Sequence, residues 1–484
     1  MPFANMLLED PAVPALERQQ ALDRIFADPG IPQKTTTSSF WLKDPHESFA
    51  TRSSKPLPVE ADIVIVGSGI TGASIARTLL ENGINPNSSN QEVPSVIMIE
   101  ARDICSGATG RNGGHILETA DEYSELADEY GEEVAKKTLR FRLAHLKEML
   151  KVCKDLGLTE HVQARKVQFL SAFFGEEPWK DALERLSRFK AGMPEEAAEW
   201  IAYDRKSMPE DFKLSRAHGV IAGPAGALWP YKFVTSLLAQ LLSKYPGQFR
   251  VEDHTAVTSI SETSSSAYNA RPPWSYLPLR GQMSAQTPGS NFPCQAAKHS
   301  WLFSYDRGFD YLTQLPSGQM MFGGGFARSE GGGLADLGIA TDNEMSLYCD
   351  IHLSGALPAV FGRQNWGEIE GDPVQAMWTG NMAFSADGFP WVGQLPTSVT
   401  KRPRSRSIDS GSEWVSAAFG GEGMVQAWLC GKALATMLLK QDGRLSPTAD
   451  DDISWLPDQM LVTEERISKS VLSRTVPSSH KASL

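Results

Sequence analysis

The chain has 484 residues and a net charge of −12 at pH 7, from 46 basic and 58 acidic side chains. This length exceeds what one hydrophobic core usually organises, so we expect two closely joined domains. The acidic excess argues against nucleic acid as a partner, and no stretch approaches the ~20 apolar residues of a membrane span, so no membrane partner is expected. Five scattered cysteines without a CxxC pair indicate free thiols in a reducing, cytoplasmic setting and no metal site.

The two ends of the chain show no motif for chemistry. Residues 1–58 contain one short amphipathic helix, around residues 14–26, and then a Pro/Ser/Thr-rich approach to the first strand. We expect this N-terminal arm to lie over a domain surface without a chemical role, and residues 441–484 to form a C-terminal tail. The final Ala-Ser-Leu matches a peroxisomal signal only loosely, because its middle residue is not basic.

The first motif is a strand, a glycine turn, a helix and a second strand. The apolar run 63–66 predicts a buried parallel strand, and Gly-x-Gly-x-x-Gly follows it at residues 67–72. A helix starting there points free N–H groups at a phosphate. The second strand, 96–100, ends in Glu100, an acid that can bind a ribose hydroxyl. Glu100 lies further along than the usual ~20 residues, and the polar stretch 85–94 reads as a loop insertion that explains the excess.

The middle of the chain alternates between helical and strand-like patterns. Apolar residues at helical spacing predict a helix over 132–156 and another around Trp179 to Phe189, and Gly-Pro-Ala-Gly-Ala-Leu-Trp-Pro leads into a third near Tyr231. Residues 309–315 and 319–322 predict an antiparallel hairpin. A strand at 414–419, a glycine turn and a helix over 424–439 repeat the opening arrangement.

Four motifs together resemble the flavin-dependent D-amino-acid oxidase (DAO) superfamily, which includes glycine, sarcosine and γ-glutamylputrescine oxidases. The first two are the strand–turn–helix motif described above and the Ser/Gly loop 106–114. The third is the stretch 279–282 together with the strand pair that contains residues 310–312 and 323–325. The fourth is the stretch 387–393 together with the turn 420–424. The resemblance implies an α/β, glutathione-reductase-2-like fold. A Rossmann-like FAD-binding domain (59–118, 219–260 and 375–440) would interleave with a smaller α+β substrate domain (119–218 and 279–374) that has a mainly antiparallel sheet.

The same resemblance implies where FAD would bind. The first motif would hold the adenosine and pyrophosphate, the Ser/Gly loop would run beside the ribityl chain and ring, and the 420–424 turn would face the pyrimidine edge. The implied cofactor-binding residues are Gly67, Ser68, Gly69, Ile70, Thr71, Gly72, Glu100, Ala101, Arg102, Ser106, Gly107, Arg111, Asn112, Gly113, Gly114, Val257, Gly388, Gly420, Gly421, Gly423 and Met424.

The expected reaction is hydride transfer from a small amine or amino acid to FAD, with O2 as the acceptor. His115, Tyr311 and Gln282 are the catalytic candidates, and Arg280 and Trp378 are the substrate-contact candidates. The sequence offers no clear arginine clamp for a carboxylate. Oxidation of a CH–OH group, on a sugar-derived or secondary-metabolite intermediate, is therefore one alternative. A flavin-fold protein without catalysis is another.

One segment departs from the family pattern. Only residues 261–278 separate the strand ending at Ile260 from the third motif, where the family has a hairpin and an apolar strand. The segment is rich in Ser and Pro and has no β-branched run, which opposes a central strand. We expect it to be shortened and irregular. The flavin sheet would then lack a strand or borrow one from elsewhere in the chain, and the neighbouring strand ends would be partly uncovered.

Overall fold

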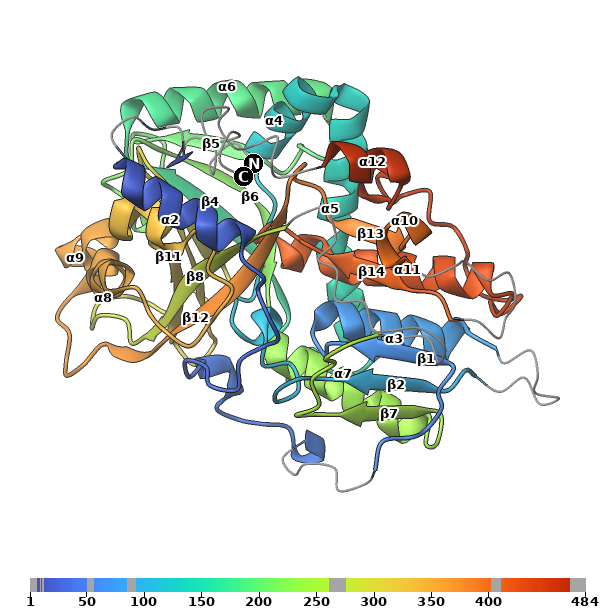
Figure 1. Cartoon of the computed structure of the whole chain (residues 1–484). Coiled ribbons are helices and arrows are strands. Elements are labelled where there is room, and N and C mark those ends of the chain that lie inside the picture. The colour runs from blue at the N-terminus through green and yellow to red at the C-terminus, as the bar shows by residue number, and fades with distance from the viewer. Residues whose placement is uncertain are drawn as a thin grey trace.

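The computed structural model describes residues 7, 8, 10, 13–49, 56–84, 93–260, 276–401 and 411–470. It confirms the expected α/β class, because a small parallel sheet lies beside a large, curled and mostly antiparallel sheet (Figure 1). The segment 261–275 lies outside the described residues.

The parallel sheet contains the first motif. Its strands are β1 (Ile63–Val66), β2 (Val96–Ile99) and β7 (Phe249–Glu252), in the order β1-β2-β7. The helix α3 (Ile70–Asn82) begins directly after Gly69, which is its N-terminal cap residue. The predicted strand–turn–helix–strand unit is therefore present, and its glycine turn lies at the carboxyl ends of β1 and β2.

The large sheet has the strand order β12-β8-β11-β10-β9-β4-β6-β3, with β5 paired to β6. All its described pairs are antiparallel except β4 with β9. The predicted hairpin is β10 with β11, in which Tyr311 pairs with Gly323. The strand bounds are β3 (His115–Ile116), β4 (Arg165–Phe173), β5 (Ile201–Asp204), β6 (Gly219–Ala227), β8 (Tyr276–Gln286), β9 (His299–Ser304), β10 (Phe309–Gln314), β11 (Met320–Gly324) and β12 (Val374–Ser385).

Helices cover both sheets and join them. One face of the large sheet packs on α8 and α9, and the other on α4 and α6 at its β4–β6 end. The long helix α5 runs between the two sheets (Figure 1). The helix bounds are α2 (Ala15–Phe26), α4 (Asp121–Tyr130), α5 (Glu132–Asp155), α6 (Glu176–Gly192), α7 (Pro230–Lys244), α8 (Leu347–Phe361), α9 (Arg363–Trp366), α10 (Thr397–Thr400), α11 (Ala427–Gln441) and α12 (Glu464–Lys469).

The last motif differs from the expected strand, turn and helix in one detail. The strand β14 (Trp414–Ala417) pairs with β13 (Trp391–Gln394) in a separate two-stranded sheet. The following residues Gly423–Val425 form a 3₁₀ turn, so the helix α11 begins at Ala427 and not at the predicted residue 424.

The shortened segment ends earlier than predicted. Residues 276–278, expected to be irregular, form the start of β8 and pair with Ala383–Ser385 of β12. Pro278 is tolerated there because its carbonyl accepts from the Gly338 N–H (2.9 Å), so its missing N–H also faces away from β12 and is not needed for that pairing.

The strand β1 lies at an edge of the parallel sheet as described, and part of it is uncovered. Val64 and Val66 are 53% and 63% exposed, whereas Ile65 is 6% exposed. Successive strand residues point to opposite faces, so the face shared by the two valines is open while α3 covers the other. Parallel sheets normally have both faces covered. The expectation that the strands beside the segment 261–278 are partly uncovered stays a prediction, because residues 261–275 lie outside the described ranges.

Within the described ranges, every helix falls short of the length and apolar character that crossing a membrane requires.

Candidate active site

Glu100 binds the glycine turn through its own carboxylate. Oε2 accepts hydrogen bonds from the Ser68 backbone N–H (3.0 Å) and Oγ (2.7 Å), and Oε1 accepts one from the Arg102 N–H (3.1 Å). Gly67 has a φ of +99°, and a Cβ there would meet nothing within 4 Å. The turn is thus held rigidly from behind while its open side offers room for a ligand to approach the backbone.

The segment after β7 completes this end of the sheet. The Thr255 N–H donates to the Glu100 carbonyl (2.8 Å), and the His254 N–H donates to the Arg102 carbonyl (3.1 Å). The half-buried Val257 belongs to this segment. Ala101 lies in the bend after β2 that the same two hydrogen bonds fix. The proposed adenosine residues therefore come together.

The Ser/Gly loop contacts the first turn of α3. Thr109 Oγ1 accepts a hydrogen bond from the Ile70 N–H (3.0 Å), one of the free donors at the helix start. Thr71 follows in the same turn. The loop continues through a 3₁₀ turn, Ala108–Gly110, capped by Gly107.

The N-terminal arm lines this loop, which sequence reasoning missed. Ser39 Oγ donates to the Gly110 carbonyl (2.7 Å), Trp41 Nε1 donates to the Asn112 carbonyl (2.5 Å), and Arg111 Nη1 donates to Thr37 Oγ1 (3.1 Å). Trp41 is fully buried. The expectation that the arm only covers a surface is corrected, because these residues hold the loop in place. The one local signal was a serine capping a short apolar run, Phe40–Leu42.

The strand β12 spans the other side of the loop. Trp378 Nε1 donates to the Arg111 carbonyl (2.8 Å), and a Cβ at Gly380 would lie 3.0 Å from Arg111 Cβ. Further along, Met382 Sδ would lie 3.1 Å from a Cβ at Gly421. Because β12 also pairs with residues 279–282 of β8, three of the four predicted motifs meet along this strand.

A polar cluster lies where the loop meets the inner face of the large sheet. His115 Nε2 is 2.8 Å from Ser300 Oγ, and Thr313 Oγ1 donates to the Gly113 carbonyl (2.8 Å). The Tyr311 ring packs on Gly113, where a Cβ would lie 2.9 Å from it. Burial lowers the pKa of His115 to about 3 and raises that of Tyr311, so both side chains are uncharged at neutral pH.

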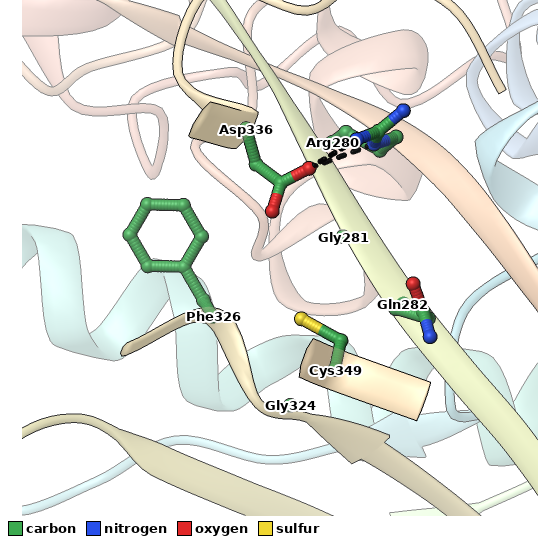
Figure 2. A pocket seen from close by; sticks show the side chains of 7 residues that line it. All are labelled: Arg280, Gly281, Gln282, Gly324, Phe326, Asp336 and Cys349. Carbon is green, nitrogen blue, oxygen red and sulfur yellow. Dashed lines mark hydrogen bonds and ion pairs between the residues drawn. The ribbon is translucent and has the colours of Figure 1, made fainter. Parts of the chain in front are cut away.

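Arg280 and Gln282 lie on one face of β8, and Met283 lies on the other. Met283 pairs with Gly323, the residue of β11 that also pairs with Tyr311. Figure 2 shows Arg280 pointing at Asp336, to which it is ion-paired (2.6 Å). Gln282 contacts Asp350 and accepts from the Ser346 N–H (2.9 Å). They line a cavity of about 10 Å³, roughly the room of one water molecule.

The remaining candidates occupy turns. Gly72 packs so closely on Gly67 that a Cβ added to Gly72 would lie 2.2 Å from the Gly67 carbonyl oxygen. Gly423 and the buried Met424 lie in the 3₁₀ turn before α11. Gly388 lies between β12 and β13, next to Asp387, which is ion-paired with Arg466 (2.7 Å). Gly114 has a φ of +64° and accepts from the Leu228 N–H (3.0 Å).

The residues around the loop fit a polar ligand. Ser106 Oγ and His115 Nδ1 are buried and have no hydrogen-bond partner within the part of the chain that the structure describes. Buried polar atoms normally find partners. Together with the open side of Gly67, these two atoms suit a long ligand that carries several oxygens and nitrogens, as a flavin nucleotide does.

The sequence matches the family described as FAD dependent oxidoreductase (DAO) over residues 62–437. The chain therefore belongs to the DAO family, and it is an FAD-dependent oxidoreductase. The resemblance seen in the motifs, the fold class and the cofactor are confirmed.

Individual relatives are more distant. Over 78 residues the chain is 38% identical to one subunit of the anaerobic glycerol-3-phosphate dehydrogenase of Haemophilus influenzae, a match that covers 16% of this chain and 12% of that protein. The fold is similar to glycine oxidase from Geobacillus kaustophilus, with a TM-score of 0.58 and 16% identity over 84% of this chain and 98% of the other. It is also similar to L-proline dehydrogenase from P. horikoshii, with a TM-score of 0.54 and 17% identity over 80% of this chain and 95% of the other.

Proposed function

We propose that the protein oxidises a C–N bond of a small amine or amino acid, as an oxidase that uses O2. The family assignment supports the oxidoreductase class, and the likeness to a glycine oxidase and an L-proline dehydrogenase supports the substrate class by analogy. When bound, FAD supplies the hydride acceptor.

The cofactor is best placed along the motifs. The turn at residues 67–72 and the start of α3 would hold the pyrophosphate, because backbone N–H groups and the helix dipole favour negative charge there. Glu100 would bind the ribose. The loop 106–114 and the turn 420–424 would border the ring. Ser106 Oγ and His115 Nδ1 are the buried atoms that such a ligand would satisfy.

The observation that carries the proposal is the uncharged cluster on the inner face of the large sheet. The pKa of His115 is lowered to about 3 and that of Tyr311 is raised, in both cases chiefly by burial. These groups suit a substrate that arrives as a neutral amine, because its own lone pair assists loss of the hydride and no strong base is required. Their role is then to orient the substrate carbon, which by itself can lower the barrier substantially.

A second candidate is oxidation of a CH–OH group. Arg280 is ion-paired with Asp336 and lies away from His115, so it does not act as a carboxylate clamp beside that cluster. The short match to a glycerol-3-phosphate dehydrogenase is consistent with an alcohol substrate. This candidate also needs a proton acceptor, for which His115 is a weak base.

A substrate panel with the purified holoprotein distinguishes the two. Glycine, sarcosine, L-proline and small primary amines are mixed anaerobically with the protein beside glycerol and glycerol 3-phosphate, and bleaching of the visible flavin band is followed. Amines should bleach it, and O2 should then restore it with release of peroxide. Bleaching by alcohols alone would overturn the C–N proposal, and reoxidation only by an artificial acceptor would overturn the oxidase assignment.

His115→Asn and Ser300→Ala test the cluster in the same assay. Both should lower the rate of bleaching, whereas His218→Asn, a change of the same kind in a loop outside this cluster, should not.

A further inference from the structure

Arg142 of α5 gathers three carboxylates from three different elements. Its Nε is 2.5 Å from Glu118 Oε2, its Nη1 is 2.9 Å from Glu122 Oε2, and its Nη2 is ion-paired with Glu422 Oε2. Glu118 follows β3, Glu122 lies in α4, and Glu422 lies in the turn before α11. The side chains of Arg142 and Glu118 are only 6% and 3% exposed.

The charges in this cluster do not balance. One guanidinium faces three carboxylates, so full ionisation would leave a net charge of −2 around the buried Arg142–Glu118 pair, with Glu122 and Glu422 26% and 38% exposed. Burial of uncompensated charge is costly and favours protonation of the least exposed acid. Glu118 is that acid. Burial raises its pKa to about 7, although Arg142 opposes the rise. Glu118 thus holds a proton over part of the physiological range.

The cluster is connected directly to the turn at residues 420–424. Gln426 Nε2 donates to Glu422 Oε2 (3.1 Å), which fixes the carboxylate that Arg142 binds. One helical turn beyond Arg142, His145 Nε2 accepts from the Leu429 N–H (3.2 Å) at the start of α11. The side chains of α5 therefore hold the turn at Glu422 and the start of α11 at Leu429.

We propose that Arg142 and Glu118 are positioning residues that hold the 420–424 turn against the cofactor, and that Glu118 is the site where this support gains or loses a proton. The inference rests on the proposed placement of this turn beside the ring. Deprotonation of Glu118 adds a negative charge behind the turn, which weakens the binding of an anionic dinucleotide. The charged groups that face Glu118 are Arg142 from α5 and Glu122 from α4, with Glu422 reached through Arg142.

The test is the dissociation constant of FAD, measured by fluorescence titration of the apoprotein at several pH values on both sides of about 7. The Kd of the unaltered protein should rise about three- to tenfold as Glu118 loses its proton, the range expected of one unit charge acting through partly polar protein. Glu118→Gln, which mimics the protonated form, should bind as tightly as the unaltered protein does at low pH and should lack the rise.

Asp121→Asn is the matched control. Burial raises the pKa of Asp121 to about 6, but the opposing cation there is Arg185 and not Arg142. This variant should keep the full pH dependence of the Kd. A flat profile in the unaltered protein, or the same rise in Glu118→Gln, would overturn the inference.

A rescue experiment tests Arg142 itself. Arg142→Met leaves the carboxylates without their cation and should lose most of the bound FAD. Adding Glu118→Gln removes one of those charges and should restore part of the binding. No recovery of FAD binding in a double variant that folds would overturn the role of Arg142. If the single variant does not fold, the pH dependence of the Kd in Glu118→Gln is the deciding measurement. Neither measurement uses a substrate, so failure of the amine proposal leaves this inference standing.

Discussion

Ser74 Oγ in α3 donates a 2.6 Å hydrogen bond to the carbonyl of Trp428 in α11, across 354 residues of sequence. The contact joins the first and last cofactor motifs. It is possible because Gly431 lets the two helices approach closely: a Cβ there would lie 2.8 Å from the Thr71 carbonyl oxygen and 2.9 Å from Ser74 Cβ. The two turns that would border the pyrophosphate and the ring of FAD are thus held by a single helix pair.

Gly431→Ala should therefore destabilise the protein by about 1–3 kcal/mol, as expected for overpacking against backbone. Urea denaturation of the holoprotein measures this. The control is Gly355→Ala in α8, where an added Cβ meets nothing within 4 Å. Alanine is preferred to glycine inside a helix by up to about 1 kcal/mol, so the control should be neutral or stabilising. Equal effects would show that the helices can separate freely.

Gly69→Val should abolish most FAD binding while the fold persists. The side chain would enter the place where the backbone must approach a pyrophosphate, and its Cβ would lie 3.1 Å from Thr109 Oγ1. The ratio of flavin to protein after purification measures the loss, and circular dichroism checks the fold. Gly411→Val, the same change at an exposed position with nothing within 4 Å, should keep its flavin. Stoichiometric flavin in Gly69→Val would show that the pyrophosphate lies elsewhere.

Ser39→Ala should weaken the cofactor site from the N-terminal arm. The change removes the hydrogen bond to the Gly110 carbonyl and the cap of the Phe40–Leu42 turn, at a cost of about 1 kcal/mol. We expect a lower melting temperature and a higher Kd for FAD. The neighbouring Ser38 is exposed, so Ser38→Ala should change neither quantity. The arm is dispensable if both variants behave alike.

His145 should make the protein sensitive to acid. Burial lowers its pKa to about 4, against an ordinary value of about 6.5 in the unfolded chain. The unfolded state therefore binds more protons between these values. His145 contributes stability above pH ~6.5 that is lost as the pH falls towards ~4.

His145→Gln checks this dependence. The variant should be less stable than the unaltered protein at neutral pH, since Nδ1 lies 3.0 Å from the Phe141 carbonyl and Nε2 accepts from Leu429. The difference in urea midpoint should shrink as the pH is lowered. A constant difference would mean that the pKa of His145 is the same in the folded and the unfolded protein.

Sequence alone predicts the parts of the site that are local. The first strand, glycine turn and helix follow each other within about 20 residues, so their pattern contains their structure, and the hairpin of β10 with β11 is local in the same way. The arm could not be predicted, because Ser39 and Trp41 bind a loop 71 residues away. Nothing in their own neighbourhood indicates that partner.

The faces of β8 show a second limit. A period of two places Arg280 and Gln282 on one face and Met283 on the other. The sequence does not say which of these faces meets the loop 106–114. That is decided by the register with β11 and β12, which brings Met283 opposite Gly323 and Trp378.

The last prediction concerns the exposed valines of the edge strand β1 in the parallel sheet. Val64 and Val66 are more than half exposed on β1, so replacing both by threonine should change the free energy of unfolding by less than about 0.5 kcal/mol. Ile65→Ala, between them and 6% exposed, should cost about 2–5 kcal/mol. An uncovered apolar edge strand is also a site for association with other chains, so the double threonine variant should aggregate more slowly on mild heating, followed by light scattering. If the double variant is instead destabilised as strongly as Ile65→Ala, the two valines are covered in solution and the parallel sheet has a further layer on this face.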